Sequence, residues 1–176
     1  MAKVVGLGHI GIYTRDLPRM VAFYRDVLGM KVTKQNWQAG MVFLSTDPQR
    51  SDHEIALMSG RPEGDWPRVI DQISMRVETL DEVREFHRRL KAAGCTIDRV
   101  VSHCSAVGCY YFDPEGNRSE VFWRSHRDCW VPTAERIDIE ALTNQDILAL
   151  VERQWQKLGH VGVGETLEPA MAVPAS

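Results

Sequence analysis

The sequence has no apolar run near 20 residues, no excess of basic residues and no Cys-x-x-Cys pair among its four cysteines. The first absence excludes a long membrane-spanning helix. The net charge of −3, from 21 basic and 24 acidic residues, argues against nucleic-acid and anionic-membrane partners. Without a signal peptide, the cysteines indicate a reduced, cytoplasmic protein, and none of them is assigned a role. We expect small-molecule partners and a homodimer or higher homo-oligomer.

The start of the chain predicts one strand and one helix. Apolar residues alternate through Gly8-His9-Ile10-Gly11-Ile12, which is typical of a strand. They then recur at helical spacing from Leu17 to Leu28, and Gly29 follows where a helix would end.

This pattern occurs twice. After a linker at 59–67 that contains two prolines and two glycines, a second predicted strand at 71–77 precedes a helix from Leu80 to Ala93 and then Gly94. A shift of 63 residues aligns Leu17 with Leu80 and His9 with Gln72. Each helix is followed by three short predicted strands: 31–33, 41–44 and 53–58 in the first repeat, and 95–97, 108–112 and 118–123 in the second, the last two joined by an Asp-Pro-Glu-Gly-Asn turn.

The repeat predicts an α+β fold of two βαβββ modules that form an open-barrel cup. We expect a domain over residues 1–125, with repeat halves at about 4–60 and 68–124. The remaining residues, 126–176, form a C-terminal extension with a helix at about 144–158 and a disordered end.

Three polar residues could converge in such a cup. Side chains alternate between the two faces of a strand, so ligands for one metal ion must come from several strands in the correct register. His9 on the first strand, Gln72 at the equivalent position of the repeat and Glu120 on the final strand meet this requirement. A histidine, a carboxylate and one further donor can hold a divalent metal ion with positions open for substrate.

The repeat, the opening Gly-His-Ile-x-Ile, Phe-Tyr-x-x-Val-Leu-Gly and the closing Asp-Pro-Glu-Gly-Asn-x-x-Glu resemble the vicinal oxygen chelate superfamily. This superfamily includes glyoxalase I, fosfomycin- and bleomycin-resistance proteins, methylmalonyl-CoA epimerases and type I extradiol ring-cleaving dioxygenases. The resemblance covers Val4 to about Trp123.

Within the superfamily, the chain is most similar to the extradiol dioxygenases. The resemblance implies metal ligands at His9 and Glu120, whereas Gln72 stands where those enzymes carry a second histidine. It also implies catalytic roles for His53 in His-Glu-Ile-Ala-Leu, for His103 ten residues before the Asp-Pro turn, and for Tyr110 three residues before that turn. The implied cofactor is Fe(II), with Mn, Co, Ni or Zn as alternatives because of Gln72, and the implied substrates are a small aromatic diol and O₂.

Two alternatives remain open. Glutamine ligands also occur in the glyoxalases and epimerases, so a non-redox isomerase or lyase could use Glu54 as a metal ligand or base in place of His53. His53 and Glu54 are adjacent, so a regular strand points only one of them into the cup. A binding protein of the resistance type, with no turnover, is the other alternative. Trp37, Phe43, Trp66 and Phe122 are candidate aromatic walls, and the identity of the substrate is not predicted.

Overall fold

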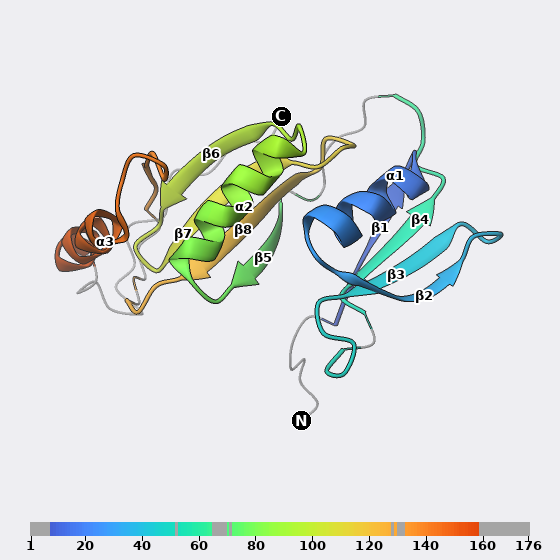
Figure 1. Ribbon diagram of the computed structural model, residues 1–176, viewed down its shortest axis with the longest axis horizontal. Helices are drawn as coiled ribbons and strands as arrows, with labels where there is room; N and C mark the ends of the chain where they lie inside the picture. The colour runs from blue at the N-terminus through green and yellow to red at the C-terminus, as the bar shows by residue number, and fades with distance from the viewer. Residues whose placement is uncertain are drawn as a thin grey trace, which may run out of the picture. The chain divides into compact units, whose positions relative to one another are not determined.

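The computed structural model describes residues 8–51, 53–64, 70, 72–127, 129 and 133–158. These residues form two mixed sheets and three α-helices, drawn in Figure 1. The elements are β1 (Ile10–Thr14), α1 (Leu17–Ala22), η1 (Phe23–Val27), β2 (Lys31–Asn36), β3 (Met41–Ser45), β4 (Ile55–Ser59), β5 (Ile73–Val77), α2 (Leu80–Ala92), β6 (Ile97–Ser102), β7 (Ala106–Phe112), β8 (Arg118–Arg124), β9 (Glu135–Arg136) and α3 (Asn144–Leu158).

The first sheet has the strand order β1-β4-β3-β2, with β1 parallel to β4 and the other pairs antiparallel. Its buried core includes Val42, Leu44 and Leu57, all fully inaccessible to solvent. Helix α1 contacts β4 and lies beside this sheet in Figure 1.

The first helix is shorter than the spacing predicts as an α-helix. Asp16 caps it by accepting a hydrogen bond from the Arg19 backbone N–H at 3.0 Å. From Phe23 to Val27 the chain continues as one π-helical turn, in which the Leu28 N–H donates to the Phe23 carbonyl. Gly29, with φ of +78°, follows this turn, as the sequence predicted.

The second sheet repeats the order of the first. Its strands are arranged β5-β8-β7-β6-β9, which matches β1-β4-β3-β2 element by element before β9 is added. Strands β1 and β5 have the same length and start 63 residues apart, as do helices α1 and α2. The predicted α+β fold with a sequence repeat is therefore confirmed.

Helix α2 begins with a capping box. The Thr79 hydroxyl accepts from the Glu82 N–H at 3.2 Å, and the Glu82 carboxylate accepts from the Thr79 N–H at 2.8 Å. At the other end, the N–H groups of Gly94 and Cys95 still donate to α2 carbonyls, and Gly94 has a φ of +77°. The predicted strand at 95–97 was therefore misplaced: β6 begins only at Ile97, because these two residues complete the helix C-terminus.

The C-terminal extension packs on the second sheet. Strand β9, which the sequence did not reveal, pairs antiparallel with β6, and α3 follows at the predicted position. Arg84 on α2 donates to the carbonyls of Ile139 and Leu142 and to the Asn144 side chain. Helix α3 buries Ile147, Leu150, Val151 and Gln154. The predicted disordered end lies outside the described residues.

Two compact units interleave along the chain. One contains residues 1–74, 85–98 and 110–120, and the other contains 75–84, 99–109 and 121–176. Among the described helices, none is long and apolar enough to cross a membrane.

Candidate functional site

Two histidines meet at the start of the first sheet. His9 lies just before β1 and His53 two residues before β4, and these strands are parallel neighbours that pair Ile10 with Ile55. The ring centroids of His9 and His53 are 4.5 Å apart. The Phe43 ring packs edge-on against His53, with 4.9 Å between centroids. The structure thus brings together two predicted site residues and one predicted aromatic wall.

Glu54, the alternative base, faces a different group. Its carboxylate accepts hydrogen bonds from the Thr46 backbone N–H at 2.8 Å and from the Thr46 hydroxyl at 3.2 Å. The strand-parity argument does not apply directly, because β4 starts only at Ile55 and both His53 and Glu54 precede it. The loop geometry instead places His53 beside His9 and turns Glu54 toward the loop after β3.

Glu120 is the centre of a polar network on the second sheet. It is buried, with 5% of its surface exposed. Its Oε2 accepts hydrogen bonds from the Ser74 hydroxyl at 2.6 Å and from Gln72 Nε2 at 3.2 Å. The Tyr110 hydroxyl also hydrogen-bonds to Glu120. Strands β5, β7 and β8 therefore join three predicted site residues, Gln72, Tyr110 and Glu120, in one network.

The surroundings of Tyr110 keep its hydroxyl protonated. Burial, and then the negative charge of Glu120, raise the pKa of Tyr110 to about 12. The Arg118 guanidinium lies over the Tyr110 ring, 4.5 Å from its centroid. Tyr110 can therefore serve as a hydrogen-bond donor.

Arg118 determines the orientation of the Gln72 amide. Its guanidinium donates to Gln72 Oε1 at 3.4 Å, while its charge is balanced by Asp98 at 3.0 Å. The amide of Gln72 therefore presents its oxygen to Arg118 and its nitrogen to Glu120. The Arg118–Asp98 pair is internally neutral, so the net charge of this network is that of the Glu120 carboxylate.

The donor types suit a divalent cation. In the described part of the chain, Glu120 receives hydrogen bonds from neutral donors and forms no ion pair with Lys or Arg, so a bound cation would compensate its buried charge. No three His, Cys, Asp or Glu side chains converge among the described residues, but the predicted ligand set contains only two residues of these types. Imidazole and carboxylate fit such an ion, and Gln72 fits it once its amide has turned to point its oxygen toward Glu120.

His103 belongs to the other compact unit. It lies between β6 and β7, and its Nδ1 is 2.6 Å from the Thr133 carbonyl oxygen. A carbonyl can only accept, so Nδ1 carries the proton of this hydrogen bond. A residue of the C-terminal extension therefore fixes the orientation of the His103 ring.

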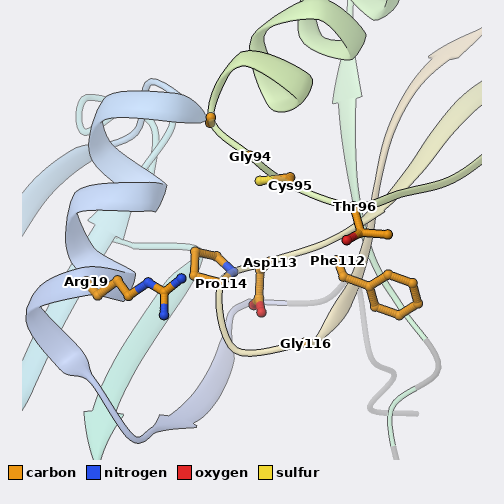
Figure 2. A pocket seen from close by; sticks show the side chains of 9 residues that line it. Arg19, Gly94, Cys95, Thr96, Phe112, Asp113, Pro114 and Gly116 are labelled. Carbon is orange, nitrogen blue, oxygen red and sulfur yellow. The ribbon is translucent and has the colours of Figure 1, made fainter.

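A cavity of about 310 Å³ lies away from the predicted residues. Figure 2 shows Arg19, Cys95, Thr96, Phe112 and Asp113 around it. None of the described residues that line it is a predicted site residue. Asp113 itself is engaged by its own turn, where it accepts hydrogen bonds from the N–H groups of Glu115 and Asn117.

Sequence reasoning missed Ser74, Asp98 and Arg118. Ser74 lies two residues after Gln72, and Arg118 lies two residues before Glu120. A strand places residues i and i+2 on the same face, so this spacing could have identified both. Asp98 comes from another strand, β6, and only the sheet order brings it near Arg118.

Two curated proteins resemble the chain. It is 31% identical over 121 residues to biphenyl-2,3-diol 1,2-dioxygenase 3 of Rhodococcus globerulus, covering 65% of this chain and 61% of that protein. It is 27% identical over 96 residues to a manganese-dependent 2,3-dihydroxybiphenyl 1,2-dioxygenase of Geobacillus genomosp. 3, covering 54% of this chain and 28% of that protein. The chain thus matches less than two thirds of either relative.

Solved structures share the fold at low identity. A fosfomycin resistance protein from Listeria monocytogenes superposes with a TM-score of 0.57 at 19% identity, covering 70% of this chain and 97% of that one. A lactoylglutathione lyase from Agrobacterium tumefaciens gives 0.54 at 21% identity, covering 69% and 96%. Residues 6–121, well over half of the sequence, match the model of one family. The chain belongs to the glyoxalase/bleomycin resistance protein/dioxygenase superfamily.

Proposed function

We propose that this protein is a metal-dependent, extradiol-type dioxygenase that cleaves the ring of a small aromatic diol with O₂. The observation that carries the proposal is the buried Glu120 carboxylate, which three neutral donors surround and no basic side chain of the described residues neutralises. The two curated relatives, both dioxygenases of dihydroxybiphenyls by name, support the choice of substrate class.

His9, Gln72 and Glu120 would hold the metal ion, with Fe(II) or Mn(II) as the first candidates. Such an ion, when bound, lowers the pKa of a diol hydroxyl and brings the diol and O₂ together. Gln72 contributes a harder and weaker donor than imidazole, so we expect looser iron binding than with histidine at this position.

The remaining residues would move protons and orient the substrate. His53 would accept a proton from a diol hydroxyl, since imidazole is the side chain most often used as a general base. Its contact with the Phe43 ring gives it an apolar neighbour that limits its rotation. Tyr110, protonated as described above, would donate a hydrogen bond to a substrate oxygen. His103, oriented by Thr133, would close the site and assist ring opening.

The test is a reconstitution under anaerobic conditions with Fe(II) or Mn(II), followed by 2,3-dihydroxybiphenyl or catechol in air. We expect a yellow ring-cleaved product and O₂ uptake with these vicinal diols. Resorcinol, whose hydroxyls are not adjacent, is the matched control and should give neither. Absence of both bound metal and O₂ uptake would overturn the proposal and favour a binding protein.

Gln72 favours a second candidate, a non-redox isomerase or lyase. An amide oxygen is a ligand for metal ions that prefer oxygen donors, and such a reaction needs no O₂. In this case the protein would bind a divalent metal ion, consume no O₂ with any diol, and convert the hemithioacetal of methylglyoxal and glutathione. Measuring O₂ uptake and hemithioacetal loss on the same metal-loaded sample separates the two candidates.

A further inference from the structure

Two cysteine thiols meet where the C-terminal extension packs against the turn between β6 and β7. Cys104 lies in that turn and is fully buried, and Cys129 follows β8 and is half-buried. The two thiol groups hydrogen-bond to one another. Both residues belong to the same compact unit.

The backbone around the pair is held by the Ser125 hydroxyl. This hydroxyl donates to the Cys104 carbonyl at 2.6 Å and accepts from the Arg127 N–H at 3.1 Å. It therefore ties the segment just before Cys129 to Cys104. On the other side, the Cys104 thiol lies 3.8 Å from the Val151 carbonyl of α3. The position of Cys104 is thus fixed from two directions.

We propose that Cys104 and Cys129 are a redox modification site that closes reversibly into a disulfide. The oxidant we name is a small disulfide such as oxidised glutathione. The Cys129 thiolate attacks one sulfur of glutathione disulfide, forms a mixed disulfide and releases one glutathione thiolate. The Cys104 thiolate then attacks the Cys129 sulfur, forms the Cys104–Cys129 bond and releases the second glutathione. Two protein thiols are oxidised, and one glutathione disulfide is reduced to two glutathione thiols.

Accessibility sets the order of these steps. Cys129 is half-buried and can meet the oxidant, whereas Cys104 has no exposed surface and can only attack a sulfur that is already beside it. Burial raises the pKa of the Cys104 thiol to about 11; Cys129 and Glu152 raise it further, while Arg127 lowers it. The second step is therefore the slower one, and its rate should rise about tenfold per pH unit below that pKa, as the thiolate fraction does.

The disulfide would fasten the His103 turn to the extension. His103 precedes Cys104 directly, and its ring already hydrogen-bonds to Thr133. Closing a loop between residues 104 and 129 would restrict the unfolded chain, so we expect a higher thermal midpoint in the oxidised protein. The pairing itself does not depend on the proposed activity.

The test treats the full chain with glutathione disulfide, alkylates the remaining thiols and maps the products by mass spectrometry. We expect the protein to lose the mass of two hydrogen atoms, to retain no glutathione, and to yield a linked Cys104–Cys129 peptide. Cys95 and Cys109 should be alkylated. A persistent glutathione adduct on the native protein, alkylation of all four cysteines, or a different pairing would each overturn the proposal.

Variants assign the roles. Cys104→Ser should trap one glutathione on Cys129, because the second attack is lost. Cys129→Ser, at the half-buried position that disturbs the core least, should leave Cys104 reduced. Cys95→Ser is the matched control and should close as the native protein does. A Cys129→Ser protein in which Cys104 still reacts with the oxidant would contradict the proposed order.

Discussion

The two repeats place different chemistry at equivalent positions. At position 9 an exposed imidazole leans on a second imidazole, His53. At position 72 a half-buried amide donates to Glu120 and accepts from Arg118. An imidazole that used one nitrogen beside Glu120 would offer an N–H to Arg118, which is itself only a donor. Gln72 therefore matches its own repeat, and the departure from a histidine pair follows from the neighbouring strand.

The sharpest contrast within this comparison is between the two glutamates. Glu120→Gln removes the buried negative charge, and we expect loss of metal-dependent turnover and metal binding more than about 100-fold weaker, since changes even to outer partners cost 10–100-fold. Glu54→Gln is the matched control in the first repeat. It disturbs only the bonds to Thr46 and should retain both properties. Metal titration and O₂ uptake measure the two effects, and a dead Glu54→Gln enzyme would favour the isomerase or lyase.

His53 is the next test, because it belongs to the first repeat alone. His53→Asn should lower kcat by about 10²–10⁴-fold, the range for a lost general base, with little change in metal affinity. His126→Asn changes an exposed histidine after β8 and serves as the control. If His53→Asn weakened metal binding as strongly as Glu120→Gln, His53 would be a ligand rather than a base.

The repeat explains how much could be predicted from the sequence. Helical spacing, a following glycine and a constant offset of 63 residues located β1, β5 and the starts of α1 and α2, because local patterns determine such elements. The grouping of Gln72, Tyr110 and Glu120 also agrees with strand alternation. The Glu54 bonds to Thr46, the Arg118–Asp98 pair and strand β9 could not be predicted, because each depends on a loop conformation or on strand order.

A smaller effect concerns the loops between the last two strands of each repeat. Glu54 bonds within its own loop, whereas Glu115 reaches the first repeat, where it accepts from the N–H groups of Arg15 at 2.6 Å and Asp16 at 2.7 Å. The Glu115 side chain is only 5% exposed, and Arg61 pairs with it. Glu115→Ala should lower the free energy of unfolding by about 1–3 kcal/mol, because these donors lose a charged acceptor.

Urea denaturation measures this difference. Glu54→Ala is the control, and it should cost less than about 1 kcal/mol, because its bonds are exposed and local. Equal losses in the two variants would show that Glu115 contributes no more than a loop residue.

The smallest expected effect is the most direct test of the match between Gln72 and its repeat. Gln72→His alone should raise iron affinity only a few-fold, because the new ring must place an N–H against Arg118. Arg118→Met removes that conflict and leaves Asp98 partly solvated, with 29% of its side chain exposed. The double variant should therefore bind iron more tightly than the sum of the single changes predicts, a coupling typical of residues in one network. Gln49→His, on an exposed loop, controls for an added imidazole. Additive effects in a double-mutant cycle of Fe(II) affinity would mean that Arg118 does not govern position 72, and an unchanged affinity in Gln72→His would remove that position from the metal site.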